Sequence, residues 1–360
     1  MSTIYGALGL SDNETVMLST LGQRVVFDAV QQVLGDHNDD LAAAIAVFVQ
    51  ETTADYKLRY KSPGTGRMQK QRSMGRPGQV KAFGSWDVAL PLEDFGDEIG
   101  HNRIDFAYMD TRELARHIQT ITVRNRNAVR FEILAALLGN VAWTFKDERW
   151  GDLTIQPLAN GDSVLYPPVV GAIDEATDDH YLESGYLASA ISDTNNPFAV
   201  MRDELVEHFG VQTGGSNLIA YINNAQTAKV KALTAFDEVN DRFVRQGGNQ
   251  ATPVGLPANV PGVIIGRINE CWVSEWRYMP AGYMFAHDLD APAPLMMRTD
   301  PANTGLPRGL SLIMQDETYP FTSSLYSHRF GLAVANRLNG VVMELANGGS
   351  YTIPTGYTKP

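Results

Sequence analysis

The strongest periodic pattern in the chain lies between Asp110 and Gly139, and it predicts one long helix. Asp110 and Glu113 form a capping box at its start, with Asp in the place of the usual Ser or Thr. Apolar residues recur at helical spacing from Leu114 to Leu138, and Gly139 ends the pattern. At ~1.5 Å per residue the helix is about 40 Å long. Because arginines and other polar residues fill its first two-thirds, we expect a spine that crosses a plate-like domain.

Two short helical pieces and a hairpin are predicted before this spine. The first piece contains the valines from Val25 to Val33 and stops at Gly35. The second is capped by Asn38 or Asp39 and carries an apolar stripe from Leu41 to Phe48. Alternation predicts strands at 86–92 and 102–109, with the polar residues 93–101 between them. A two-strand hairpin is not stable alone, so it must lean on its own domain or on a neighbouring subunit.

The rest of the chain mixes short strands with short helices. Two strands are predicted around the turn Asn160–Gly161, and Asn196–Pro197 opens a helix that Gly210 stops. A strand at 217–222 and a helix at about 225–234 precede a Gly/Pro-rich loop at 246–262. Two or three strands follow within 260–289, and closing strands are predicted within 329–345 and at 350–354. The fold class is therefore α+β.

Charge is distributed unevenly along the chain, whose net charge is −12. Residues 1–56 contain eight acidic residues and one basic residue, whereas residues 57–81 contain eight basic residues and no acidic one. The basic segment is either a solvated loop, a nucleic-acid-binding arm, or a surface that meets the acidic region of another copy. The overall acidity argues against nucleic acid. The candidate contact residues between copies are Lys57, Arg59, Lys61, Arg67, Lys70, Arg72, Arg76, Lys81, Asp28, Asp36, Asp39, Asp40, Glu51 and Asp55.

The sequence contains no arrangement of residues that predicts an active site. Phosphate-loop, dinucleotide and nucleophile-elbow motifs are absent. The best metal-like cluster, which is more often an exposed acidic loop, consists of Asp178, Asp179, His180 and Glu183. Cys271 is the single cysteine, excludes an internal disulfide and is expected to be a small core residue. We therefore assign no catalytic, cofactor-binding or metal-binding residue, and no cofactor. No apolar run approaches the ~20 residues of a membrane span, and no secretory signal is visible, so we expect a soluble intracellular protein.

The order of these elements resembles a known family. The residues that carry the likeness are the spine-helix end at 129–140, the segment VLYPP at 164–168, the late strand pattern at 262–300 and the closing segment at 328–345. Together they resemble the major capsid protein of tailed phages, which has the Hong Kong 97-type fold, and within it the lambda-type family (capsid protein E). The likeness spans most of the chain as architecture.

The resemblance implies a structural protein, not an enzyme, that assembles as pentamers and hexamers into an icosahedral shell around double-stranded DNA. Its implied parts are an N-terminal arm at 1–55, an extended loop at 56–109, a peripheral domain at 110–213 with the spine helix at 110–140, an axial domain at 214–322, and closing strands at 323–360. The implied partners are further copies of the chain, with scaffolding, portal and decoration proteins. Contact with the packaged DNA would be weak and non-specific, and no membrane partner is expected. The implied locations are the virion and, during assembly, the host cytoplasm.

Two alternatives stay open. An encapsulin-type compartment that encloses cargo enzymes would share the fold. A metal-dependent enzyme would use the cluster between Asp178 and Glu183. Some relatives cross-link a loop lysine to a neighbouring asparagine, but no local motif carries that chemistry to Lys61, Lys70 or Lys81.

Overall fold

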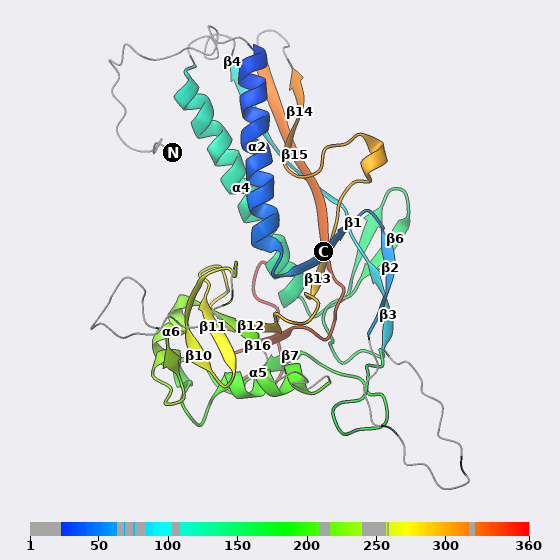
Figure 1. Ribbon diagram of the computed structural model, residues 1–360, viewed down its shortest axis with the longest axis vertical. Coiled ribbons are helices and arrows are strands. Elements are labelled where there is room, and N and C mark those ends of the chain that lie inside the picture. The colour runs from blue at the N-terminus through cyan, green and yellow to red at the C-terminus, as the bar shows by residue number, and fades with distance from the viewer. Residues whose placement is uncertain are drawn as a thin grey trace. The chain divides into compact units, whose positions relative to one another are not determined.

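The structure, a computed structural model, is shown in Figure 1. It describes residues 23–62, 68, 75, 84–102, 109–208, 217–239, 257, 259–316 and 321–359. The chain forms two compact units, each assembled from segments that are far apart in the sequence. Unit 1 draws on segments 1–45, 92–132 and 298–331, and unit 2 on segments 46–91, 133–297 and 332–360.

Unit 1 packs two helices beside an antiparallel sheet. In Figure 1, α2 (Gln23–Ile45) and the first part of α4 (Thr111–Leu138) lie next to the strands of this sheet. Its long strand β15 (Phe321–Val334) pairs with β14 (Ser311–Asp316) on one side and with β4 (Glu93–Asn102) on the other. Apolar side chains from both helices and the sheet form the core of this unit: Val30, Leu34, Ile118, Ile121, Leu310 and Tyr326. A short 3-10 helix, η2 (Ala302–Thr304), precedes β14.

Helix α4 confirms the predicted long helix and both of its ends. The backbone N–H of Glu113 donates to Asp110 Oδ1 at 2.7 Å, as a capping residue requires. The helix stops at Leu138, and Gly139 follows it. The apolar face toward its C-terminal end is buried because Leu134, Leu137 and Leu138 lie almost wholly out of solvent.

Helix α2 is continuous, so the predicted stop at Gly35 is wrong. A glycine within a helix costs about 1 kcal/mol relative to alanine. Burying a leucine stabilises by roughly 1.5–3 kcal/mol, and the helix buries both Leu34 and Leu41. Packing on both sides of Gly35 therefore outweighs its low helix propensity.

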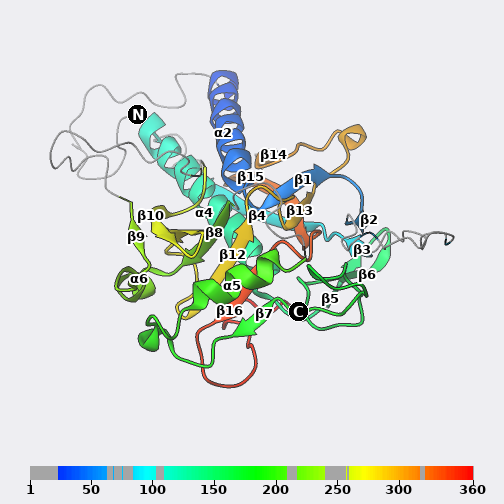
Figure 2. The same cartoon turned by 60° about the horizontal axis from the view of Figure 1, so that its bottom comes forward.

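Unit 2 is built on a seven-stranded mixed sheet. Its strand order is β7-β16-β12-β8-β11-β10-β9. The central strand β8 pairs parallel with β11 and antiparallel with β12, and it is buried along its whole length, which explains its unbroken apolar run. Figure 2 shows α5 (Pro197–Val206) lying across β16 and β12. The strand bounds are β7 (Tyr181–Glu183), β8 (Leu218–Ile222), β9 (Asp237–Glu238), β10 (Val263–Ile268), β11 (Cys271–Glu275), β12 (Tyr283–Asp288) and β16 (Val341–Glu344).

The helices of unit 2 start where the sequence predicts. Helix α5 (Pro197–Val206) is capped by Asn196, whose side chain accepts from the Phe198 N–H at 3.0 Å. It ends at Val206, before the predicted stop at Gly210. Helix α6 (Asn224–Lys231) begins with a capping box formed by Asn223 and Gln226. The 3-10 helix η1 (Ala188–Ala190) lies between β7 and α5.

Two small sheets complete unit 2 and share one apolar cluster. β2 (Lys57–Lys61) pairs with β3 (Ser85–Ala89), and β5 (Trp143–Asp147) pairs with β6 (Gly151–Ile155). The indole N–H of Trp86 donates to the Ala335 carbonyl at 2.8 Å and anchors the first hairpin. Their cluster includes Trp86, Val88, Leu90, Leu153, Ile155 and Tyr166. β1 (Val49–Thr53) pairs with β13 (Leu295–Arg298), and both belong to the five-stranded sheet that contains β15.

The predicted partner of strand 86–92 is wrong. This strand, β3, pairs with β2, and the expected polar connection at 93–101 is itself the strand β4. Phe95 and Ile99 alternate on the inner face of β4, and Phe95 stacks on Phe330 with ring centroids 4.7 Å apart. Acidic residues on both faces of the strand hide this alternation: Asp94 and Glu98 are exposed, and Asp97 shares the face of Phe95 and Ile99. The predicted strand at 102–109 lies mostly outside the described residues.

Two further strand predictions are wrong. β6 pairs with β5 instead of forming a hairpin around Asn160–Gly161, and residues 164–168 form no strand beyond a single bridge between Tyr166 and Ala176. Residues 350–354 also form no strand, because the Thr352 N–H donates to the carboxylate of Glu344 in place of a neighbouring strand.

The helices that the structure describes include none of the length and apolar character that crossing a membrane requires.

Candidate functional site

The acidic contact candidates that precede the basic segment are exposed. On α2, Asp28, Asp36, Asp39 and Asp40 all point to solvent. At 100° per residue they fall within an arc of about 120° of the helix surface, and the buried Leu34 lies outside this arc. In unit 2, Glu51 and Asp55 are also exposed. The acidic residues of α2 therefore form a stripe on one exposed face of the helix.

Two of the basic candidates have an acidic partner within the chain. Across the β2–β3 hairpin, Lys57 Nζ lies 3.0 Å and Arg59 Nε 2.9 Å from the carboxylate of Asp87. The hydrogen bonds from Arg59 and Lys57 lower the pKa of Asp87. Lys61 is exposed on the same hairpin. The other basic candidates lie outside the described residues: Arg67, Lys70, Arg72, Arg76 and Lys81.

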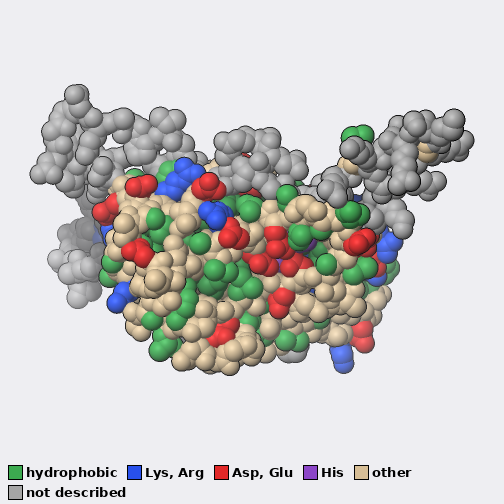
Figure 3. Space-filling view, turned by 90° about the horizontal axis from the view of Figure 1, so that it is seen from below, with side chains coloured by type: hydrophobic (Ala, Val, Ile, Leu, Met, Phe, Trp, Pro, Cys, Tyr) green, Lys and Arg blue, Asp and Glu red, His purple; other side chains and the backbone are tan. Residues whose placement is uncertain are grey.

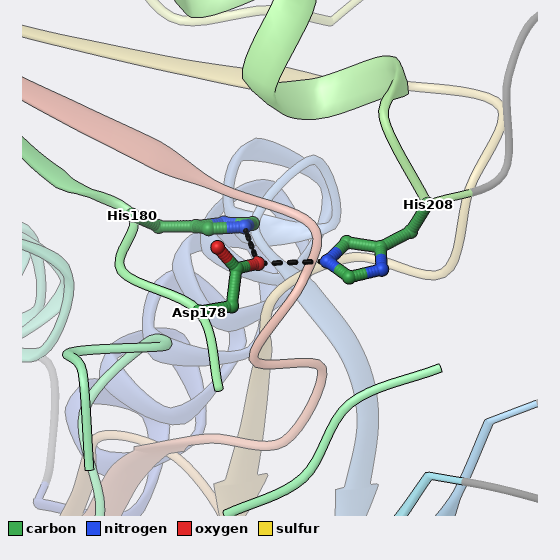
Figure 4. Close-up of side chains that lie close together, drawn as sticks. All are labelled: Asp178, His180 and His208. Atoms are coloured by element: carbon green, nitrogen blue, oxygen red, sulfur yellow. Dashed lines mark hydrogen bonds and ion pairs between the residues drawn. The ribbon is translucent and has the colours of Figure 1, made fainter. Parts of the chain in front are cut away.

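The four residues of the metal-like cluster predicted from the sequence do not stay together in the structure. Asp178 and His180 turn inward and meet His208, which follows the end of α5 (Figure 4). Asp179 instead accepts from the Tyr181 N–H, and Glu183 accepts from the backbone N–H groups of a distant turn. The prediction that these residues form an exposed loop is therefore wrong for His180, which is fully buried.

Both histidines have a defined tautomer. His180 Nδ1 lies 2.7 Å from the Gly340 carbonyl, and His208 Nδ1 lies 2.7 Å from the Pro167 carbonyl. Because a carbonyl oxygen only accepts, each Nδ1 carries a proton and donates it. Each Nε2 then faces the same oxygen, Asp178 Oδ2, at 2.8 and 2.7 Å.

This arrangement favours positive charge between the two rings. Burial alone would raise the pKa of Asp178, but hydrogen bonds from His180 and His208 hold that pKa well below its usual range. Burial likewise opposes charge on His180, yet the hydrogen bond and charge of Asp178 raise its pKa. The carboxylate of Asp178 and the imidazole of His180 therefore stabilise each other as charged groups, or the three side chains share a cation.

Two glutamates at the end of α5 lie beside the same carboxylate. The ligand atoms of Asp178, Glu204 and Glu207 all lie within 4.8 Å of one another. Burial raises the pKa of Glu204 to about 7, and burial also raises the pKa of Glu207. Figure 3 shows acidic side chains gathered near the middle of one face of the molecule. Glu204, Glu207 and His208 were not predicted from the sequence, although their spacing of three and four places them on one helical face.

The other chemical candidate, Cys271, is a core residue as predicted. Its side chain is buried in β11, and burial raises the pKa of the thiol to about 12. His287 is also fully buried, in a ring cluster with Phe48, Tyr221 and Phe285. A thiol that stays protonated and out of solvent is a poor nucleophile.

No family model and no curated protein matches this chain. Its structure is similar to a solved chain from Mycobacterium phage Patience, with a TM-score of 0.68, 18% identity, and coverage of 99% of this chain and 98% of the other. It is also similar to a chain of the mature capsid asymmetric unit of bacteriophage PhiM1, with a TM-score of 0.51, 9% identity, and coverage of 82% and 84%. A third similar chain belongs to the capsid structure of the cyanophage P-SCSP1u, with a TM-score of 0.50, 10% identity, and coverage of 84% and 87%.

These similarities establish the fold of the chain. The expected α+β fold of a phage capsid protein, the Hong Kong 97-type, is confirmed because two of the three similar chains come from phage capsids. The narrower lambda-type assignment stays a prediction.

Proposed function

We propose that this chain is the major capsid protein of a tailed phage, and that it assembles as pentamers and hexamers into an icosahedral shell around double-stranded DNA. The observation that carries the proposal is the similarity of fold to the phage Patience chain over 99% of this chain. The likeness to chains from two phage capsids supports the same role. The role is structural and located in the virion, and it includes no enzymatic activity.

Exposed apolar side chains on α2 support assembly. Val25 is 59%, Val33 49% and Phe27 43% exposed. Three large apolar side chains left exposed within nine residues of one helix are typical of a surface that a partner covers. In the proposed shell, a neighbouring subunit covers this part of α2.

We propose a division of the subunit into parts that follows the arrangement of parts in this type of capsid fold. Residues 1–55 form the arm, 56–109 the extended loop, 110–213 the peripheral domain, 214–322 the axial domain, and 323–360 the closing strands. The β2–β3 hairpin at the base of the proposed loop supports this division, because a two-stranded sheet needs packing from elsewhere. Scaffolding, portal and decoration proteins are the further partners that we propose, and they bind the assembled chains.

The proposed contact between subunits pairs the acidic residues of the arm with the basic residues of the loop. The acidic stripe on α2 is exposed and available for such a contact. Lys57 and Arg59 already pair with Asp87, so Lys61 and the basic residues beyond it are the better candidates. An exposed ion pair contributes only about 0–1 kcal/mol, but a shell repeats the contact in every subunit.

An encapsulin-type compartment is not favoured. The similar structures with a TM-score of at least 0.50 reported above come from phages. The two roles differ in what the shell encloses. Particles purified from producing cells would contain nuclease-protected DNA in the phage role and a cargo protein in the encapsulin role.

Assembly is the direct test of the proposal. The untagged chain, expressed alone and with its neighbouring genes, should form closed particles in negative-stain electron microscopy and in sedimentation. A chain that stays a monomer under both conditions would refute the proposal.

The charge contact has a separate test. Changing Arg67, Lys70 and Arg72 to Glu should reduce the yield of particles while circular dichroism shows a folded subunit. The matched control exchanges Arg and Lys at the same three positions and so keeps the charge. Because salt screens exposed charges, high salt should weaken the wild-type contact. Normal assembly of the charge-reversed variant at low salt would contradict the contact.

A further inference from the structure

We propose that Asp178, His180 and His208 form a binding site for a divalent transition-metal cation, Zn²⁺ in particular, with Glu204 and Glu207 at its edge. The three ligand atoms are Asp178 Oδ2 and the Nε2 atoms of both histidines, which converge in Figure 4. This proposal concerns the chain itself and does not rest on the capsid role.

The orientation of the two rings is the first argument. Metal-binding histidines in proteins usually donate their second ring N–H to a carbonyl or carboxylate, which fixes the ring and its tautomer. His180 does this with the Gly340 carbonyl and His208 with the Pro167 carbonyl, each at 2.7 Å. Both Nε2 atoms consequently face the same carboxylate oxygen, Asp178 Oδ2, and neither is needed as a donor to the backbone.

The spacing of the ligand atoms is the second argument. The two Nε2 atoms lie 2.8 and 2.7 Å from Asp178 Oδ2. Around a zinc ion with bonds of about 2.0–2.1 Å, neighbouring ligand atoms lie roughly 2.9–3.4 Å apart. Asp178 Oδ2 therefore needs to move away from each ring by only about half an ångström, and the two Nε2 atoms already lie within 4.8 Å of one another.

Burial and charge give the third argument. His180 is 0% and His208 3% exposed, and the side chain of Asp178 is 10% exposed. Asp178, Glu204 and Glu207 add three carboxyl groups to this small region. A divalent cation would neutralise two of these negative charges while the imidazoles stay neutral.

The ligand set indicates the kind of ion. Two imidazole nitrogens with one carboxylate suit zinc and its neighbours in the transition series, whereas calcium and magnesium prefer oxygen ligands alone. Either glutamate, or water, could complete a four-coordinate site. The ion would join the loop before β7 to the end of α5, and the carbonyls that orient the rings come from two further segments of unit 2. Its role would be structural.

Metal analysis of the purified, untagged protein tests the site. After growth with zinc and dialysis, the wild-type chain should retain about one zinc ion per chain. His208→Gln and Asp178→Asn should lose it. The control His117→Gln changes a histidine of α4 outside the cluster and should retain it. A wild-type chain without metal, or a His208→Gln variant that keeps it, would overturn the site.

A measurement on the wild-type chain alone guards against variants that do not fold. Co²⁺ added to metal-free protein should produce the visible absorption of a tetrahedral nitrogen–oxygen site, and Zn²⁺ should abolish it. If the two imidazoles are instead both protonated and held by Asp178, no ion binds and no such absorption develops, which would refute the proposal.

Discussion

Arg337 is the largest fully buried side chain in the described residues, and its replacement gives a sharp test of how unit 2 is held together. Its guanidinium donates to the carbonyls of Pro157 and Leu158 at 2.8 and 3.1 Å. It also donates to Asn160 Oδ1 at 3.1 Å and to Asp162 Oδ2 at 2.8 Å. One side chain thus fixes a six-residue segment that has no regular secondary structure of its own.

Removing this guanidinium should cost about 3–5 kcal/mol, the usual price of leaving the partners of a buried charge unsatisfied. Arg337→Met keeps the length of the side chain and removes every donor. Arg337→Lys keeps the positive charge, but a lysine ammonium cannot reach all the acceptors that the planar guanidinium contacts. We therefore expect a loss of stability smaller than that of Arg337→Met. Asp162→Asn should cost less than Arg337→Met, because the amide oxygen can still accept from the guanidinium and the side chain of Asp162 is 27% exposed.

Urea unfolding followed by tryptophan fluorescence measures these losses in the right place. All five tryptophans belong to unit 2, as Arg337 does: Trp86, Trp143, Trp150, Trp272 and Trp276. The control Arg277→Met changes an exposed arginine and should shift stability by no more than about 0.5 kcal/mol. If Arg337→Met unfolds at the same urea concentration as the wild-type chain, the segment is held by other contacts and the reasoning fails.

Three further predictions concern single residues. His328 accepts at Nδ1 from Asn125, and burial lowers its pKa from 6.5 to about 4. The neutral form is therefore favoured in the folded state, so its contribution is complete above pH 6.5 and falls by roughly 2 kcal/mol at pH 5; acid unfolding in which His328→Gln has the same pH dependence as the wild-type chain would contradict this. Gly35→Ala should raise stability by about 0.5–1 kcal/mol, because a Cβ there meets no atom within 4 Å, and an unchanged or lower unfolding midpoint would count against it. Asn196→Ala should cost about 1 kcal/mol through the lost cap of α5, whereas Asn196→Asp keeps the cap acceptor but loses the N–H that donates to Asn269 Oδ1, so it should recover only part of that stability, as thermal unfolding of both variants would show.

The parts of the fold that local signals specify were predictable from the sequence. The cap at Asp110 and the glycine after Leu138 set the ends of α4, and Asn196 with Pro197 set the start of α5. The buried run at 218–222 and the strand around Cys271 were equally clear. In each case the residues that determine the element are neighbours in the chain.

The wrong predictions concern segments whose structure depends on contacts with residues that are distant in the sequence. Gly35 does not stop α2, because packing within unit 1 outweighs its low propensity. Segment 93–101 reads as polar, yet Phe95 pairs its ring with Phe330, which is more than two hundred residues away. Hydrophobic periodicity is read over a window of about 11–18 residues. A contact between segments much farther apart in the sequence therefore leaves no signal in that window.

The candidate metal site shows the same division. Asp178 and His180 were recognised because they are adjacent in sequence, and Asp179 and Glu183 were included for the same reason. The chain folds so that only the first two face inward, and the third ligand, His208, arrives from the end of α5. The pattern Glu204, Glu207 and His208 marks one face of a helix end, but the sequence alone does not state which loop that face meets.

Charge along the sequence is subject to the same limit, and this bears on how the proposed contact between subunits should be tested. Counting charges gives eight basic residues without an acidic partner between 57 and 81. Asp87, however, lies directly across the hairpin from Arg59, and it forms ion pairs with both Arg59 and Lys57. Reversing those two residues would therefore disturb the hairpin as well as any contact with a neighbour. Reversing Arg67, Lys70 and Arg72 leaves this pairing intact, so a loss of assembly in that variant, with the subunit still folded, can be attributed to the contact between subunits.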